Sequence, residues 1–598
     1  MLPTEVQRIL LLIGLAATGY LMILAWNEDF GQKAADLPYS EAPVVPANPS
    51  PSDTMVSTGN SVGNSIGQST QSGNQPQHSD IPDDSLLVRS GSNPEEGGAE
   101  TTGQGRVAET EPVAQEPGRL IKIETDTLVL WVDLLGGDII RAQLPKYPID
   151  LERPDIPVVL LDSGNGHTYI AQSGLIGPDG IDSKGTRPLY QSRQSSYRFT
   201  GSQQPSEVVL STRNGNLEVQ KVFLFHPGEY VIDVTYRVSN QRSTPLQTGL
   251  FVQIKRDDKR PENETSVAMG PRPYLGAALT TNETRYEKLT FDDLDEQTFR
   301  EVVKGGWVAM LQHYFLSAWI GQPEDNNRYY GQKSSDGNYL VGYSGPIRQV
   351  QPGESAEFGS RFYAGPKDQD KLESLAPNLN LTVDYGFLWW IAVPLFHLLQ
   401  WLYSFLGNWG LAIIGLTVIV KLVLFPLSAA SYRSMANMKR VAPQMKKLQE
   451  RYSSDRQKLS QEMMAFYKKE KVNPLGGCLP MLLPMPVFIA LYWVLFESVE
   501  LRQAPFFAWI HDLSQMDPYF VLPLLMGASM YATQLLNPAP PDPTQAKVMK
   551  MMPIMFTVLF LFFPSGLVLY WLVNNLLSIA QQWYITRQIV PAEPKTSS

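Results

Sequence analysis

The sequence predicts a multi-span α-helical membrane protein with a large extracytoplasmic antiparallel β-sandwich domain. Two runs long enough to cross a bilayer lie far apart, at 9–26 and 409–425, and further apolar runs follow the second. Between them, short alternating segments separated by turn residues fill positions 119–370. The formal net charge of -10 does not reveal this organisation, because acidic and basic residues are segregated along the 598-residue chain.

Residues 1–27 are expected to form an N-terminal transmembrane anchor. The uncharged run from Ile9 to Trp26 is longer than the apolar region of a signal peptide, and Asn27-Glu28-Asp29 follows it in place of a small-residue cleavage site. A cleaved signal peptide is the alternative. Residues 28–118 are rich in Ser, Gly, Asn, Gln, Pro and acids, which cannot bury enough apolar area to offset their ordering entropy. This segment is therefore expected to be a flexible linker.

Residues 119–370 are expected to form the sandwich. In the stretch 231–238, apolar and polar side chains alternate, as they do in a strand with one buried face. Turn signals separate such runs at Asn214-Gly215, His226-Pro227-Gly228 and Gln351-Pro352-Gly353. The long series of short strands favours antiparallel pairing in two packed layers.

The sandwich shows no cluster of catalytic or metal-binding residues. Its histidines, His167, His226 and His313, are scattered without ligand spacing, and the single Cys478 lies in an apolar stretch. We therefore expect no cofactor, no metal and no enzymatic activity. Sandwiches of this size can bind sugars, so a membrane-anchored carbohydrate-binding protein stays open as an alternative function.

The last third of the chain carries the remaining apolar segments. Residues 371–408 include three tryptophans in a broken apolar pattern, which suits an amphipathic helix at the membrane interface. Apolar runs at 409–425, 478–496, 519–536, 551–563 and 567–584 then predict a transmembrane core over 409–590. Pro564-Ser565-Gly566 either kinks one long helix or turns the chain between two short spans, and hydropathy alone leaves this open.

A basic segment between two of these runs sets the expected topology. Residues 430–473 carry eleven Lys and Arg against four acids, which places them in the cytoplasm. Apolar residues at helical spacing predict two helices packed as a hairpin, with a solvated loop as the alternative. Its bases suit contacts with anionic lipid or ribosomal RNA. The sandwich, one span earlier, is then extracytoplasmic.

Lys421 is a cation inside the apolar run 409–425. A charge at the centre of a membrane helix costs about 2.5 to 3.5 kcal/mol, so it needs either a partner or a function. The alternative is that Lys421 lies near the helix end and extends to the headgroups. Thr417 shares its helix face, and Asn574, Asn575, Ser578, Gln581 and Gln582 form a polar stripe on the last span. These groups indicate either a wet cavity or interhelical hydrogen bonds.

Four long strings of residues resemble the YidC membrane-protein insertases of Gram-negative bacteria. They are Gln461 to Cys478, Glu500 to Phe506, Trp509 to Ser514 and Phe563 to Tyr570. The order of anchor, linker, sandwich and helical module is also similar to that family over the whole chain. The resemblance implies six spans, of which five form the conserved core, in the inner membrane. It also implies cytoplasmic termini, with the short tail 591–598 in the cytoplasm, and a periplasmic sandwich.

The resemblance further implies an insertase and folding chaperone that works alone or with the Sec translocon. Its partners would be nascent membrane proteins, Sec components, membrane lipids and, through the basic hairpin and tail, the ribosome, but not DNA. A secondary transporter with Lys421 as coupling charge is the other alternative, although no paired intramembrane acid or inverted repeat accompanies it.

The resemblance also implies a mechanism in which a hydrophilic groove within the membrane receives the incoming chain and a cation there attracts its acidic or polar tail. Two sets of site residues follow from this mechanism. The expected groove residues are Lys421, Thr417, Tyr570, Trp571, Asn574 and Gln581. The expected apolar slide, along which a client moves toward lipid, is Met481, Met485, Phe488, Met555, Leu559 and Phe562. Lys421 stands where the family usually has Arg, which keeps the charge but loses bidentate recognition of carboxylates.

Overall fold

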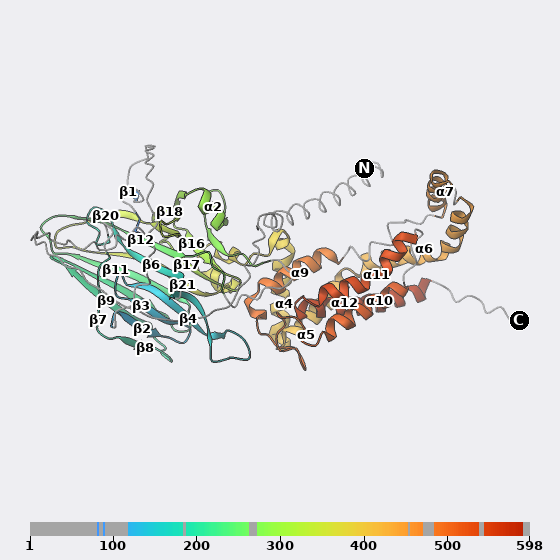
Figure 1. Ribbon diagram of the computed structural model, residues 1–598, viewed down its shortest axis with the longest axis horizontal. Helices are drawn as coiled ribbons and strands as arrows, with labels where there is room; N and C mark the ends of the chain where they lie inside the picture. The colour runs from blue at the N-terminus through green and yellow to red at the C-terminus, as the bar shows by residue number, and fades with distance from the viewer. Residues whose placement is uncertain are drawn as a thin grey trace, which may run out of the picture. The chain divides into compact units, whose positions relative to one another are not determined.

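The computed structural model describes residues 81–82, 88–89, 118–164, 166–182, 187–261, 272–452, 455–470, 484–536 and 543–589. The expected anchor and most of the expected linker lie outside these residues. The described chain forms a β-rich domain, which ends with β21 (Ser355–Pro366), and a helical module that begins with α4 (Trp389–Leu406) (Figure 1). The order of a β-rich part followed by a helical part agrees with the prediction.

One sheet of the described domain has twelve strands. Its main path runs β15 (Phe299–Lys304), β18 (Asn326–Lys333), β19 (Tyr339–Ser344), β12 (Leu246–Arg256), β6 (His167–Ile176), β5 (Pro157–Gly164), β4 (Asp138–Pro148), β3 (Val129–Asp133), β2 (Leu120–Glu124) and β8 (Ser196–Arg198). Off this path, β20 (Pro346–Val350) pairs with β12, and β1 (Val88–Arg89) pairs with β20.

The second sheet has nine strands among the described residues. Its order is β14 (Glu287–Leu289), β13 (Gly276–Leu279), β16 (Trp307–Leu311), β17 (Phe315–Ile320), β21, β11 (Val231–Asn240), β10 (Leu217–Phe225), β9 (Ser206–Asn214) and β7 (Gln191–Ser192). All of its pairings are antiparallel, whereas the first sheet includes two short parallel pairings, of β1 with β20 and of β2 with β8.

The predicted strand at 231–238 lies in β11, and its buried face is the predicted one. Ile232, Val234, Tyr236 and Val238 are all at most 1% exposed, and the intervening residues are more exposed. The predicted turns also connect strands: β9 to β10, β10 to β11 and β20 to β21. Gly215 has φ +59° at the first of these turns, in the left-handed region that a glycine adopts without strain.

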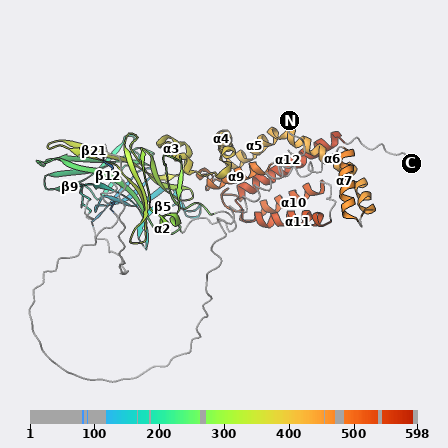
Figure 2. The same ribbon diagram turned by 90° about the horizontal axis from the view of Figure 1, so that it is seen from above.

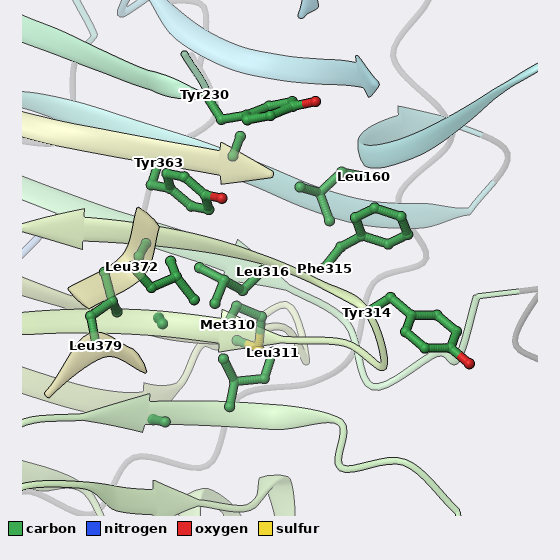
Figure 3. Close-up of a cluster of buried hydrophobic side chains, with 14 of the residues drawn as sticks. Leu160, Tyr230, Met310, Leu311, Tyr314, Phe315, Leu316, Tyr363, Leu372 and Leu379 are labelled. Carbon is green, nitrogen blue, oxygen red and sulfur yellow. The ribbon is translucent and has the colours of Figure 1, made fainter. Parts of the chain in front are cut away.

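The two sheets share one apolar core. Figure 3 shows part of it, where Met310 and Leu316 from neighbouring strands pack near Leu372 of α3 (Gln369–Leu375). Trp307 and Trp319 are among its largest fully buried side chains. Each such aromatic residue buries about 150–250 Å².

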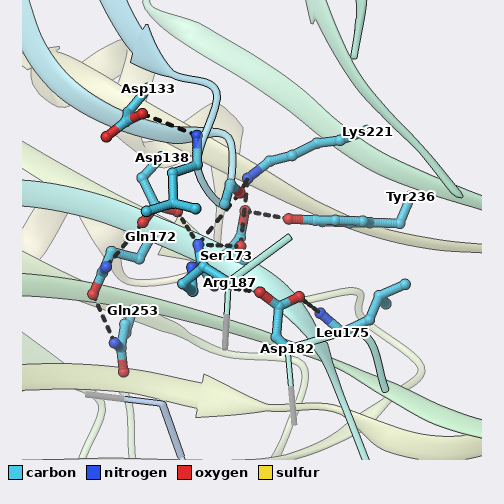
Figure 4. A network of polar contacts seen from close by, with 12 residues as sticks. Asp133, Asp138, Gln172, Ser173, Leu175, Asp182, Arg187, Lys221, Tyr236 and Gln253 are labelled. Carbon is cyan, nitrogen blue, oxygen red and sulfur yellow. Dashed lines mark hydrogen bonds and ion pairs between the residues drawn. The ribbon is translucent and has the colours of Figure 1, made fainter. Parts of the chain in front are cut away.

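A buried polar network lies inside the sandwich (Figure 4). The Arg187 side chain is 4% exposed, and its guanidinium forms ion pairs with Asp138 and with Asp182, the latter at 2.7 Å. Lys221 donates from Nζ to the carbonyls of Gly136 at 3.1 Å and Ser173 at 3.4 Å. Buried charges are costly unless they are paired and hydrogen-bonded, and this network provides both, apart from Arg187 Nε, which has no hydrogen-bond partner within the described structure.

The helical module continues from α4. Its helices are α5 (Trp409–Val423), α6 (Phe425–Arg451), α7 (Arg456–Lys469), α9 (Met485–Glu497), α10 (Val521–Leu536), α11 (Pro543–Phe560) and α12 (Ser565–Ile589). Figure 2 shows α10 and α11 side by side. The helical conformation is interrupted between α11 and α12, where the Ser565 N–H donates to the Gln515 carbonyl at 2.7 Å. Pro564 therefore lies in a turn between two helices and does not kink one helix.

Helices α5 and α6 meet at Leu424, and their axes differ by 67°. The first arm of the predicted hairpin thus begins within α6 at Phe425, ahead of the expected position 430. Its far half packs on α7, where Val441 and Met445 are buried with Met463 and Phe466 against them. Asp455 caps α7 by accepting from the Lys458 N–H at 3.0 Å.

Few of the described helices are long and apolar enough to cross a membrane. The helix Gly386–Leu406 is, and so is the bent pair Trp409–Val423 with Phe425–Met445 if the pair counts as one span. Met485–Glu497 and Val521–Leu536 are apolar but shorter. The count of six spans therefore stays a prediction. The interfacial position of 371–408 also stays one, although α4 exposes Trp389, Trp390 and Trp401 along one side.

Hydrogen bonds and an ion pair join the sandwich to the C-terminal end of α9 and the residues after it. The His313 Nε2–H donates to the Phe496 carbonyl at 2.8 Å, and burial lowers the pKa of His313 to about 3. Lys367 pairs with Glu497 at 3.4 Å, with side chains that are 2% and 6% exposed. Arg502 donates to the Pro148 carbonyl at 2.7 Å. The first of these bonds satisfies the Phe496 carbonyl at the C-terminus of α9, where carbonyls have no partner within the helix itself.

Candidate functional site

The candidate site begins with the polar stripe of α12. Asn574, Asn575, Ser578 and Gln582 recur on one helix face, as spacings of three or four residues dictate. Asn575 Nδ2 donates to Ser529 Oγ on α10 at 3.1 Å, and Ser578 Oγ donates to the Asn574 carbonyl at 2.7 Å. Part of the stripe therefore serves as an interhelical contact, as one of the two sequence interpretations held.

Lys421 lies against this stripe. The residue is 7% exposed, and its Nζ donates to Ser578 Oγ at 2.6 Å. Gln581 Nε2 lies 3.5 Å from the Lys421 carbonyl, which is the limit of a hydrogen bond. Among the residues that the structure describes, no carboxylate pairs with this ammonium group. The cation is thus held inside the module by a hydroxyl, without a neutralising partner.

A cavity of about 140 Å³ lies beside Ser578, between α6, α9, α10, α11 and α12. Its lining combines two sets of side chains, a polar and aromatic set and a set of methionines that we call the methionine wall. The polar and aromatic lining residues are Tyr432, Thr533, Gln534, Trp571, Asn574, Asn575, Ser578 and Gln582. The methionines are Met435, Met485, Met530, Met549 and Met552, with Pro484 and Pro553 beside them. The cavity can therefore contact a polar segment and an apolar one at the same time.

Some buried polar atoms of this lining have no hydrogen-bond partner within the described structure. Trp571 Nε1 is one and Gln534 Oε1 is another, although Gln534 Nε2 donates to the Met549 carbonyl. A buried polar group without a partner costs about 1–3 kcal/mol, so such atoms are normally bonded to water or to a bound molecule. The lining thus offers a donor and an acceptor to whatever fills the cavity.

The predicted groove residues divide into three groups in the structure. Trp571 and Asn574 line the cavity. Lys421 and Gln581 lie one layer behind it, through Ser578 and the Lys421 carbonyl. Thr417 and Tyr570 lie elsewhere. Thr417 is 1% exposed and donates to the Ile413 carbonyl of its own helix at 2.7 Å. Tyr570 is 1% exposed and packs on Phe488, with ring centroids 6.3 Å apart.

The predicted apolar slide is also divided. Met485 lines the cavity, and Met555 is 60% exposed on α11. Phe488 packs edge-to-face on Trp571 with ring centroids 4.5 Å apart, so it supports the wall from behind. Leu559 is half-buried near the end of α11, Phe562 is half-buried in the turn before α12, and Met481 lies outside the described residues. An exposed apolar strip does follow α11, through Val548, Met551, Ile554, Met555 and Val558.

Several lining residues were not predicted from the sequence. Met549 and Met552 belong to a methionine-rich run, and Met530, Thr533 and Gln534 recur at helical spacing in α10. Both patterns were visible, but neither says which helix faces which. Tyr432 and Met435 were assigned to the hairpin or its approach, yet α6 is continuous and carries them to the cavity.

Comparisons with known proteins match both parts of the chain. The family described as YidC periplasmic domain matches residues 120–398, and the family described as 60Kd inner membrane protein matches 401–593. Membrane protein insertase YidC of Azotobacter vinelandii is 48% identical over 98% of this chain and 99% of that protein. The chain belongs to the YidC family of membrane protein insertases. The corresponding protein of Pseudomonas entomophila is 49% identical, over 99% of this chain and 100% of its own.

Solved structures were also found to be similar. A crystal structure of an active YidC insertase with its first transmembrane domain resolved is 19% identical with a TM-score of 0.36, over 79% of this chain and 93% of that one. A galactose mutarotase-like protein from Lactobacillus casei is 10% identical with a TM-score of 0.29, over 41% of this chain and 99% of its own.

Membership of the YidC family makes the chain an inner-membrane insertase with a periplasmic domain, and not an enzyme. Its substrates are nascent membrane proteins. The β-rich domain is the periplasmic one, since the matched range contains every sandwich strand from β2 to β21. The transporter and the carbohydrate-binding alternatives are therefore set aside as the main function.

Proposed function

We propose that the insertase receives the polar, translocated tail of a client in the cavity beside Lys421, while the client's apolar segment leaves along the methionine wall toward lipid. The observation that carries this proposal is that a buried cation, which has no carboxylate partner among the described residues, lies beside a cavity lined by both polar side chains and methionines. A purely structural polar contact would need neither the cavity nor the methionines.

The cation attracts the client's acidic tail. Lys421 contacts Ser578, and Ser578 lines the cavity, so a small shift of one hydroxyl brings the ammonium into contact with a carboxylate there. In an environment of low dielectric constant, such attraction is much stronger than in water. Lysine acts as a compact point charge without arginine's planar fork, so we expect attraction without strict geometric selection.

The methionine wall accepts the apolar segment. Methionine is unbranched and adapts its shape, which suits a surface that contacts many sequences. The exposed strip of α11 continues from this wall, since Met552 lines the cavity and Met555 is one turn further along. Free energy for insertion then comes from moving the client's apolar span out of water, at about 25 cal/mol per Å².

The finer topology and partners are part of this proposal. We expect six spans, cytoplasmic termini and a cytoplasmic hairpin formed by α6 and α7. The basic residues of that hairpin support contacts with the ribosome and with anionic lipid. Cooperation with the Sec translocon is expected for clients whose periplasmic domains are too large for the cavity alone.

Substitution of Lys421 tests the mechanism. In proteoliposomes, Lys421→Arg should insert an acidic-tailed client at close to the wild-type rate, whereas Lys421→Ala and Lys421→Glu should fail. A matching client with neutralised tail residues should be inserted by all four proteins, because it needs no attraction. Lys421→Ala should also be no less stable, since it removes an insertion cost of about 2.5 to 3.5 kcal/mol.

Lys304→Ala is the matched control, because Lys304 is an exposed lysine on the sandwich. It should behave as wild type with both clients. Insertion of the acidic-tailed client by Lys421→Ala at the wild-type rate would contradict the attraction mechanism and favour a lysine that merely extends to the headgroups.

A further inference from the structure

A cleft of about 340 Å³ opens in the sandwich, far along the chain from the groove residues. It lies where β17 leaves the nine-stranded sheet at Ile320 and the chain crosses to β18 in the other sheet. Strand β21 continues past that point. β17 pairs with β21 only from Arg361 to Pro366, so on this side the stretch from Ser355 to Ser360 has no strand partner among the described residues.

The open edge of β21 presents backbone groups to the cleft. The Ala364 N–H donates to Tyr230 on the β11 side, and the Lys367 N–H donates to Tyr314 on the β17 side. Along a strand, the N–H and C=O groups of successive residues point alternately to the two neighbouring strands. Glu357 and Gly359 are an even number of residues from Lys367, so their N–H and C=O groups point to the β17 side and face the cleft. Their carbonyls accept only from side chains, Arg348 Nη1 at 3.5 Å and Gln322 Nε2 at 3.4 Å.

Those two contacts are at the limit of a hydrogen bond, so backbone N–H groups at the usual 2.9 Å would replace them favourably. The edge from Ser355 to Gly359 is roughly 15 Å long at the rise of a β-strand. An unpaired edge of this kind is a template for the addition of another strand. The same end of the domain already accepts one extended segment, because Val88–Arg89 pairs with β20 beside Pro346.

The charges around the cleft are balanced. Asp325 pairs with Arg348 at 2.7 Å, Glu357 with Arg237 at 3.2 Å, and Glu324 with Lys304 at 3.0 Å. Phe358 is 3% exposed, and the Arg348 guanidinium lies over its ring at 5.8 Å. Among the residues that line the cleft, a strongly charged occupant would find no unpaired partner, whereas an uncharged backbone would find the hydrogen-bonding groups of the strand edge.

We propose that this cleft binds an extended, uncharged segment of another polypeptide by adding it as a strand to the open edge of β21. Recognition runs through the backbone, so it tolerates many sequences. The site holds periplasmic segments of polypeptides in an extended form, and it acts independently of insertion through the groove.

The test measures binding of a fluorescent, capped peptide of alternating Thr and Val to the full-length protein in detergent, by anisotropy. A second peptide of the same sequence carries N-methyl groups on alternate residues, which removes its donors along one edge. We expect the N-methylated peptide to bind at least about tenfold more weakly, since one lost hydrogen bond is worth about 1 kcal/mol and several are lost.

Two variants of Gly359 complete the test. Gly359→Pro removes the N–H that faces the cleft and should weaken binding by a similar factor, because proline is tolerated at a strand edge but cannot donate. Gly359→Ala keeps that N–H, and its Cβ would lie 3.4 Å or more from its neighbours, so it should bind as wild type. Unchanged far-ultraviolet circular dichroism would show that both variants are folded.

Three results would overturn the proposal. They are equal binding of the two peptides by the wild-type protein, wild-type binding by folded Gly359→Pro, and binding of a maltooligosaccharide in the cleft without any binding of peptide. Insertion of the acidic-tailed client by Gly359→Pro should be unchanged, which separates failure of this site from failure of the groove mechanism.

Discussion

At the residue scale, two buried lysines illustrate how surroundings decide the role of a charge. Lys221 is 1% exposed and faces Asp138, Asp182 and Arg187, with carbonyls of Gly136 and Ser173 as acceptors. Lys421 is 7% exposed, and the described structure gives it a hydroxyl partner and no carboxylate. The first lysine belongs to a closed network, so its effect should be on stability. The second is the lysine that we propose attracts the tail of a client.

Lys221 gives a prediction about pH. Burial lowers the pKa of Lys221 to about 7 from an ordinary value of 10.5. Between these values the unfolded state binds more protons than the folded state, so stability rises with pH from about 7 to 10.5. Burial raises the pKa of Asp182 from 3.8 to about 6, so this carboxyl makes stability fall with rising pH between those two values, which lie below pH 7. The interval from pH 7 to 9 therefore isolates the lysine.

We expect the sandwich to gain stability on the order of 2 kcal/mol from pH 7 to 9 relative to a Lys221→Met variant. Hydrogen exchange of peptides from β10 and β11, corrected for the intrinsic pH dependence, measures this within the full-length protein. Lys304→Met, which alters an exposed lysine, should follow the wild-type curve. Parallel curves for wild type and Lys221→Met would show that the ammonium is not titrating in the network.

At the element scale, α6 serves two structures at once. Near its start, Ala429 and Tyr432 are buried with Ile585 of α12, and Phe425 packs against them. Further along, Val441 and Met445 are buried against α7. The first half therefore belongs to the wall of the cavity, and only the second half belongs to the hairpin. A deletion that spares the first half should separate the two roles.

Deletion of residues 440–468 should impair insertion while leaving the membrane module folded, because it removes basic surface and not the packing at Ala429 and Tyr432. Insertion in a depletion strain and resistance of the module to proteolysis are the two measurements. A charge-only variant, Lys458→Gln with Lys468→Gln and Lys469→Gln, keeps the apolar contacts of the hairpin. It should show part of the same defect if recruitment is electrostatic.

Aggregation or degradation of the shortened protein would mean that the hairpin supports the spans. A full insertion rate with the charge-only variant would instead assign recruitment to the apolar side of the hairpin.

At the scale of the whole molecule, local patterns predicted elements better than contacts. The alternation around Val234 and the turn at Asn214-Gly215 were sufficient for β11 and for the β9–β10 hairpin, because strand period and turn chemistry are local. The position of Lys421 within an apolar helix was equally visible. Its contact with Ser578 was not, since 157 residues separate the two and only helix packing brings them together.

The buried network of Arg187 and the open edge of β21 were missed for the same reason. Arg187 is 49 residues from Asp138, and no local period signals such a pair. The open edge exists because β17 ends at Ile320 while β21 extends further, which is a property of two strands together. Sequence patterns therefore described the elements and the class of site, whereas packing decided which residues form each wall.

The junction between sandwich and α9 bears on the last prediction, that most of the sandwich is dispensable for insertion. Deletion of residues 125–340 removes His313 and the carbonyls that Arg502 contacts. Water can then satisfy the Phe496 carbonyl and the Arg502 guanidinium, which lose these partners. It retains Lys367, the partner of Glu497.

We therefore expect the deletion to support insertion in a depletion strain. The same deletion with Lys367→Met should melt at a lower temperature, because losing one partner of a buried pair costs up to about 3–5 kcal/mol, and less where water reaches the remaining charge. Loss of insertion by the first variant, despite normal accumulation, would show that the sandwich takes part in insertion itself.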